Sequence, residues 1–141
     1  APSNNSWQNS GQVSFQYTAI DPRLRNCTLY GDFAGSWAAN YTNNSATSGV
    51  QDTIVVNLKN GSFLWNVECY DYASNSAFNL TNYTINVDSI SPNIDLNAPI
   101  NGYNTSNNDV LFNWTATDNL DDSMLCNLTI MKLMNWTDSM F

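Results

Sequence analysis

Apolar and polar residues alternate along much of this 141-residue chain. The alternation is clearest over residues 13–19, 63–69 and 83–87. A period of two is typical of β-strands with one buried face. Residues 52–58, DTIVVNL, form a short apolar run rich in β-branched residues, and the Asn-Gly pair in residues 59–62 predicts a hairpin to the next strand. No segment keeps a helical period, so the sequence predicts an all-β fold.

Two stretches of the chain are nearly the same. VSFQYTAID covers residues 13–21 and VLFNWTATD covers residues 110–118, at an offset of 110 − 13 = 97. Further matches keep their order: Ala1-Pro2 with Ala98-Pro99, Cys27 with Cys126, and Trp37 with Trp136. The last two pairs are offset by 126 − 27 = 99, which indicates a two-residue insertion after Asp118. The chain therefore contains an internal repeat.

The length of the repeat predicts its architecture. Short strands separated by Asn, Gly and Ser turns, in a unit near 97 residues (110 − 13), are typical of a β-sandwich. We expect a complete repeat over residues 1–89, a Pro-containing linker over residues 90–97, and the first part of a second repeat over residues 98–141. Because a half sandwich would expose strand edges, we expect either that the native chain continues or that a neighbouring subunit supplies the missing strands.

The charge of the chain narrows the choice of partners. Four Lys and Arg stand against twelve Asp and Glu, for a net charge of −8. Nucleic acids and anionic membrane surfaces are bound through clustered Lys and Arg, so neither is an expected partner. No apolar run is long enough to span a membrane, so this segment is not expected to be membrane-spanning.

Asparagine is more frequent than all charged residues together. With 24 Asn and 27 Ser plus Thr, random placement would give about 24 × 27/141, or roughly 4 to 5 N-x-S/T sequons. The chain holds 11, at Asn4, Asn26, Asn40, Asn43, Asn60, Asn79, Asn82, Asn104, Asn113, Asn127 and Asn135. Asn113 and Asn127 each alternate with apolar neighbours and are expected to point outward, where a glycan fits. The excess favours N-glycosylation and therefore an extracellular, cell-surface location.

The three cysteines fit that location. Cys27 and Cys69 both fall on the inward side of predicted strands, and in an oxidising compartment we expect them to form a disulfide. Two buried free thiols are the alternative. Cys126 corresponds to Cys27, so its partner is expected in the missing part of the second repeat.

A family resemblance rests on CTLY (residues 27–30) and on a longer stretch, NGSFLWNVECYDYASNSAFNLTNYTINVDSISPNIDLNAPINGYNTSNNDVLFNWTATDN (residues 60–119). These resemble the tandem Ig-like repeats of archaeal, less often bacterial, surface proteins, with the strand motif G-x-Y-x-W-x-V-x-C-x-D-x-x-G-N. Phe63 stands in place of the usual Tyr, and DYASN in place of the D-x-x-G-N turn.

The resemblance implies tandem Ig-like β-sandwich repeats in an S-layer, cell-surface or extracellular filament glycoprotein. Its expected partners are copies of itself, in a filament or an array. An adhesin or carbohydrate-binding module is the alternative.

Candidate catalytic chemistry is sparse. The chain has no His, which excludes His-based acid–base catalysis, Ser-His-Asp triads and His-ligated metal sites. The one Glu, Glu68, is predicted on the outward, solvated side of its strand. We therefore expect no enzyme and no cofactor.

Calcium is a weaker alternative. Asp88 and Asp95 flank the joint between the repeats, and Asp118, Asp121 and Asp122 cluster in TDNLDD. Carboxylate oxygens suit Ca²⁺, but the cluster lacks the spacing of an EF-hand loop. Solvated acids in a turn are the favoured interpretation.

Five Trp and seven Tyr raise the possibility of sugar binding by ring stacking. Trp65 and Trp114 lie on the predicted inward sides of strands, which favours core packing. Trp37 and Trp136 are repeat equivalents, which favours a structural role. Trp7 remains the candidate for a free, ligand-binding ring.

Overall fold

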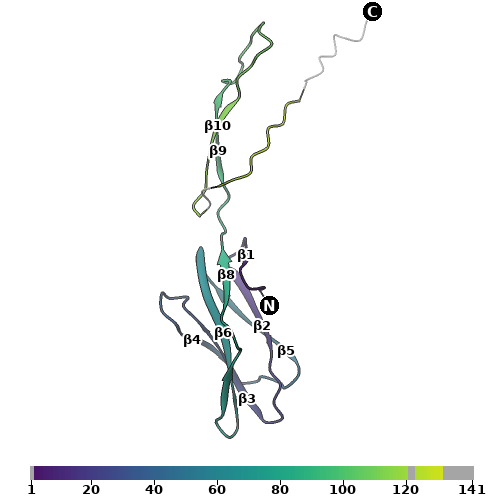
Figure 1. Ribbon diagram of the computed structural model, residues 1–141, viewed down its shortest axis with the longest axis vertical. Helices are drawn as coiled ribbons and strands as arrows, with labels where there is room; N and C mark the ends of the chain where they lie inside the picture. Colours follow the sequence, from purple (N-terminus) through teal and green to yellow (C-terminus); the bar gives the residue numbers. More distant parts are fainter. Residues whose placement is uncertain (1, 121–122, 132–141) are drawn as a thin grey trace, which may run out of the picture. The chain divides into compact units, whose positions relative to one another are not determined.

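The computed structural model describes residues 2–120 and 123–131, and in this part of the chain all regular structure is β-strand (Figure 1). The chain divides into two units, residues 1–91 and residues 92–141. The all-β prediction is confirmed. Over the same described ranges, no helix is present that could cross a membrane.

Unit 1 contains eight strands in two sheets. The larger sheet has the order β1-β8-β6-β3-β4, with β7 also paired to β6. Its strands are β1 (Ser6–Gln8), β3 (Leu24–Gly31), β4 (Ala38–Asn43), β6 (Gly61–Asp71), β7 (Ser76–Phe78) and β8 (Tyr83–Val87). β1 runs parallel to β8, and the other pairs are antiparallel. The smaller sheet pairs β2 (Gln12–Thr18) with β5 (Gln51–Asn57), antiparallel.

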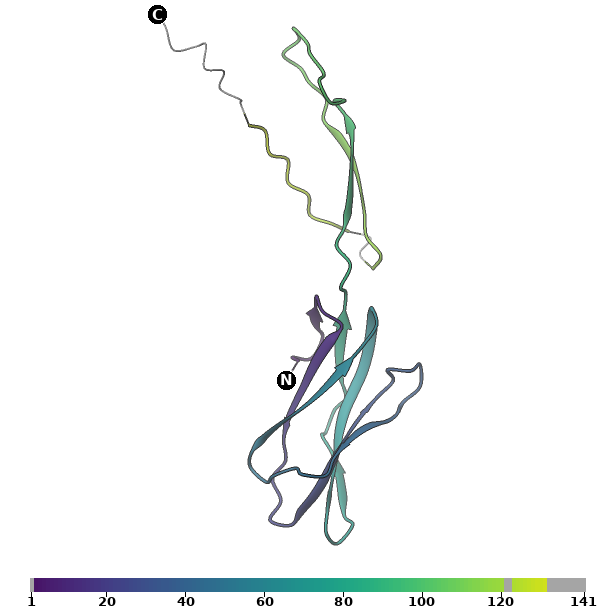
Figure 2. The same ribbon diagram turned by 180° about the vertical axis from the view of Figure 1, so that it is seen from behind.

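The buried side chains of unit 1 come from both sheets. The apolar ones that form the core are Val13, Phe15 and Ile54 from the smaller sheet, and Cys27, Leu29, Trp65, Val67, Ile85 and Val87 from the larger one. The ring of Phe15 lies 4.9 Å from that of Trp65 and 5.4 Å from that of Phe33, between centroids. Two sheets that share one apolar core are consistent with a β-sandwich (Figures 1 and 2).

The hairpin predicted at residues 59–62 is wrong. β5 and β6 belong to different sheets, so this segment crosses from one sheet to the other. Ile54 on β5 and Trp65 on β6 are buried in the shared core, and they reach it from different sheets. The side-chain oxygen of Asn60 accepts hydrogen bonds from the backbone N–H and the hydroxyl of Ser89, which ties the connection to the chain after β8.

Unit 2 contains an antiparallel pair, β9 (Asn93–Ala98) and β10 (Asn113–Thr117). The division between residues 91 and 92 falls within the linker expected over residues 90–97, but most of that segment forms β9 and belongs to unit 2. Pro92 and Pro99 flank the strand instead of interrupting its ladder, which is where proline is tolerated.

Two burial predictions in unit 2 are also wrong. Trp114 was expected in a core, yet it is 36% exposed. Residues 123–131 form no strand, and Leu128 and Ile130, expected to point inward beside Asn127, are exposed. Within its described residues, unit 2 has no second sheet for these side chains to pack against, so nothing removes them from solvent.

Candidate functional site

A disulfide joins Cys27 of β3 to Cys69 of β6. The two residues are direct cross-strand partners in the larger sheet, with Cα atoms 4.0 Å apart. Cys27 is fully buried against the core, and Cys69 is partly exposed. The pairing predicted from the sequence is therefore present. Cys126 is free and partly exposed.

The sequon asparagines lie on the outside of the molecule. Seven of them are exposed: Asn4, Asn40, Asn79, Asn82, Asn104, Asn113 and Asn127. Asn26, Asn43 and Asn60 are partly exposed, and Asn135 lies outside the described residues. By contrast Asn66, which is not in a sequon, is 4% exposed. Its amide donates to the backbone carbonyl of Asn79 and to the side-chain oxygen of Asn82, so it has a packing role.

The sequon amides differ in how they are bonded. The Nδ2 of Asn40 donates to the carbonyls of Gly31 (3.1 Å) and Ala38 (2.7 Å). The Nδ2 of Asn43 donates to the hydroxyl of Tyr17 at 3.0 Å. In contrast, the bond of Asn82 is made by its oxygen, which accepts from Asn66. A glycan on Nδ2 replaces one of the two amide hydrogens, so these positions are not chemically equivalent.

Glu68 is buried, which contradicts the solvated position predicted for it. It is 8% exposed, and its carboxylate accepts a hydrogen bond of 2.9 Å from the hydroxyl of Ser76. Its cross-strand partner on β7 is Phe78, and side chains of such a pair lie on the same face. The outward parity was right, but β7 folds back alongside β6 and covers this position.

An aromatic cluster lies next to Glu68. The ring of Tyr30 packs 5.0 Å from that of Phe78 and 6.1 Å from that of Trp37, between centroids. The pKa of the Tyr30 phenol is raised, first by burial and then by its hydrogen bond to Glu68 and the negative charge there. We define Tyr30, Trp37 and Phe78 as the outer aromatic cluster. Trp37 was predicted to have a structural role, and the cluster could not be predicted from the sequence because its three rings come from separate segments.

Trp37 and Trp7 are both accessible. Trp37 is 41% exposed and Trp7, on β1, is 57% exposed. Trp136, the predicted equivalent of Trp37, lies outside the described residues. Both accessible indoles can therefore contact a ligand, but Trp37 alone of the two belongs to the outer aromatic cluster.

The aspartates considered for calcium take part in separate local contacts. Asp88 accepts from Ile90 N and from the Asn60 amide, Asp95 accepts from the Asn93 amide, and Asp118 accepts from Leu120 N. Asp121 and Asp122 lie outside the described residues. Over residues 2–120 and 123–131, no three acidic or Cys side chains come together as a metal site.

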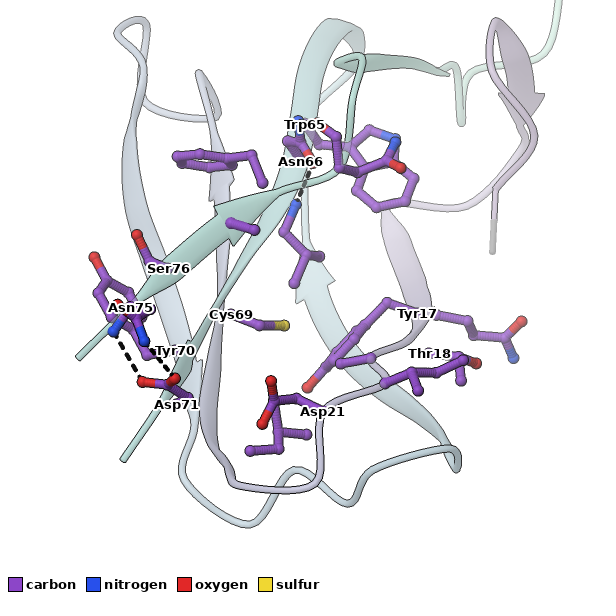
Figure 3. A pocket seen from close by; sticks show the side chains of 18 of the residues that line it. Tyr17, Thr18, Asp21, Trp65, Asn66, Cys69, Tyr70, Asp71, Asn75 and Ser76 are labelled. Atoms are coloured by element: carbon purple, nitrogen blue, oxygen red, sulfur yellow. Dashed lines mark hydrogen bonds between the residues drawn. The ribbon is translucent and has the colours of Figure 1, made fainter. Parts of the chain in front are cut away.

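Unit 1 has a groove of about 560 Å³ beside the end of β2, which we call the β2 groove. Residues 16–21 form one wall, and β6, β7 and the segment up to Tyr83 form the other. Figure 3 shows Trp65 and Asn66 at one end, and Asp21 and Asp71 at the other. Burial raises the pKa of the Tyr17 phenol, and the hydrogen bond from Asn43 partly opposes that shift.

No protein-family model, curated protein or solved structure matches this chain.

Proposed function

We propose that this chain is an N-glycosylated structural subunit of an extracellular surface assembly, a filament or an S-layer-like array. The observation that carries the proposal is the placement of the sequons. Every sequon asparagine among the described residues is exposed or partly exposed, whereas the deeply buried Asn66 is outside any sequon. Bulky sugars require such accessible positions.

The disulfide supports the same location. Disulfides persist outside the cytosol, and Cys27 of this disulfide is fully buried. It joins two strands of one sheet, whereas the bridge of antibody domains joins two sheets.

We also propose that the repeats are Ig-like. The neighbours β3-β6-β8 opposite β2-β5 correspond to the C-F-G and B-E neighbours of Ig domains. A fold of this kind serves many functions, so the functional proposal rests on the surface asparagines.

Mass measurement tests the glycosylation. Native material should show glycoforms heavier than the bare chain of 15.7 kDa, with glycopeptides covering exposed sequons such as Asn82 and Asn113. A chain produced without a glycosylation system is the matched control. Native material at the bare mass would contradict the proposal.

Imaging tests the assembly. Electron microscopy of cell-surface material should show a filament or lattice whose repeating subunit contains this chain. In such an assembly, copies of the chain are the partners, and neighbouring strands can complete exposed sheet edges. Native protein that remains monomeric at high concentration would contradict the structural role.

The outer aromatic cluster favours a second candidate, a carbohydrate-binding module. Trp37 stacks on Tyr30 and stays 41% exposed, so one ring is held in place with accessible area. Calorimetric titration with cell-surface glycans would show binding that is lost in Trp37→Ala and kept in Trp7→Ala, if the cluster is the site. No measurable binding would leave the structural proposal as the better one.

A further inference from the structure

The β2 groove lies where unit 2 has a strand. Under the repeat offset of 110 − 13 = 97, β10 corresponds to residues 113 − 97 = 16 to 117 − 97 = 20. β10 is paired with β9 along this length. In unit 1, residues 16–20 line the β2 groove, and among the described strands β2 is paired with β5 alone. Equivalent residues thus border a strand in one unit and a groove in the other.

We propose that the β2 groove is the seat of an additional β-strand of the β9 type. This strand runs antiparallel to β2 and is continuous with the chain on the N-terminal side of Pro2. Its chemistry is that of Asn-Ile-Asp-Leu-Asn ahead of Ala-Pro, as in residues 93–99. The inference depends on the repeat and on the geometry of unit 1, and it stands whether or not the chain belongs to a surface assembly.

The apolar side chains of such a strand fit the groove. Two cross-strand pairs of unit 2 define the register: Leu96 with Trp114, and Ile94 with Ala116. Under the repeat offset, Trp114 corresponds to Tyr17 (114 − 97) and Ala116 corresponds to Ala19 (116 − 97). Tyr17 and Ala19 are partly buried against the core. Cross-strand partners share a face, so the Leu and Ile of the added strand enter the groove beside Tyr17 and Ala19.

The backbone of β2 presents the required edge. The carbonyl of Ala19 accepts a hydrogen bond of 2.8 Å from Gly49 N, on the β5 side. Asp21 N, two residues further on, also bonds on that side, to Ser48 Oγ (3.1 Å). Successive peptide groups of an extended chain point to opposite edges, so those of Thr18, the last residue of β2, and of Ile20 point toward the groove side. An edge of this kind is a template for another strand.

The start of the chain lies at the correct end of the groove. Pro2 is buried, Asn5 N donates to the carbonyl of Thr84 (2.9 Å), and Asn4 accepts from Thr84 N (2.8 Å). Thr84 follows Tyr83, which lines the groove together with Trp65. The Trp65 indole N–H is buried and has no acceptor among the described residues, and a carbonyl of the added strand can supply one.

Two extended chains test the proposal. One carries Pro-Asn-Ile-Asp-Leu-Asn, the sequence of residues 92–97, directly ahead of Ala1. The matched control carries Asn in place of the Ile and the Leu. Burial of two aliphatic side chains should lower the unfolding equilibrium constant of unit 1 on the order of tenfold or more. Hydrogen exchange at the amides of Thr18 and Ile20 should slow in the same chain, and the control should behave like the unextended chain.

Three results would overturn the proposal. In the first, neither extension alters stability or exchange. In the second, both extensions alter stability equally without protecting Thr18 and Ile20. In the third, a free peptide of residues 92–99 protects these amides while the attached strand does not, which assigns the seat to a separate chain.

Discussion

Cys27 and Cys69 face each other directly across the neighbouring antiparallel strands β3 and β6, and the disulfide between them crosses the middle of the larger sheet. The backbone ladder already holds these strands together in the folded state. The bridge therefore stabilises the fold mainly by restricting the unfolded chain between two cysteines separated by 42 positions.

Removing the bridge should be costly. The double substitution Cys27→Ser/Cys69→Ser should lower the free energy of unfolding by about 3–4 kcal/mol on the chain-entropy estimate. Urea unfolding of unreduced protein measures the loss, with Cys126→Ser as the control that leaves the bridge intact. Equal midpoints for the double variant and the control would contradict this prediction.

The core of unit 1 should be sensitive at Phe15. Its side chain is fully buried, with its ring packed against Trp65 and Phe33. Phe15→Ala should reduce the free energy of unfolding by about 3–5 kcal/mol, since it removes apolar contact and leaves a cavity. Val55→Ala, at an exposed position of the neighbouring strand, is the control and should change the urea midpoint little.

Tyr30 should make the fold sensitive to alkali. Its pKa is raised in the folded protein, so folding favours the neutral phenol. This contribution is fully present below the unfolded pKa, near 10, and is lost as pH rises through the higher folded pKa. Tyr30→Phe should flatten that part of the stability–pH profile. The exposed Tyr103→Phe is the control, and identical alkaline profiles for the two variants would refute the assignment.

Asp71 should contribute to the stability of the fold at neutral pH and lose that contribution in acid, whereas Tyr30 loses its contribution in alkali. Its carboxylate accepts from the side-chain and backbone N–H groups of Asn75, and the side-chain bond is the main cause of its lowered pKa. The contribution is present above the unfolded pKa and is lost as pH falls through the lower folded pKa. Asp71→Asn should destabilise the turn between β6 and β7 at neutral pH more than in acid, as measured by amide exchange of Asn75. A loss that does not vary with pH would contradict the charge-based explanation.

Glycan occupancy should differ between Asn82 and Asn40 if the chain is N-glycosylated as proposed. The Asn40 amide donates to two carbonyls, so a glycan there removes a bond of the fold. Asn82 uses its oxygen as acceptor, so it can carry a glycan without that loss. Quantitative glycopeptide analysis of native protein should show higher occupancy at Asn82. Equal occupancy would indicate that attachment precedes folding or ignores these bonds.

Much of unit 1 could be predicted from local pattern. The alternation over residues 13–19, 63–69 and 83–87 corresponds to β2, β6 and β8. Period-two alternation is a property of each strand on its own, so it can be recognised without knowing which strands pair. The inward parity of Trp65 was correct for the same reason.

The predictions were wrong where a neighbouring strand or sheet determines whether a residue is buried or which strands pair. Glu68 points away from the core as expected, yet β7 covers it. The Asn-Gly segment permits a hairpin, yet β5 and β6 pair in different sheets. Trp114 has the parity of a core residue, yet no second sheet covers it within the described residues of unit 2.

The sequence by itself determined the alternation of β2, β6 and β8, the internal repeat, and the positions of the cysteines and the sequons. Each of these depends on residue identity and spacing, which act locally along the chain. Only the tertiary structure decided which strands are neighbours, that the bridge lies within one sheet, and that β2 borders a groove. Strand pairing brings together residues far apart in sequence, and its energy comes from burial and cross-strand contacts that no local pattern contains.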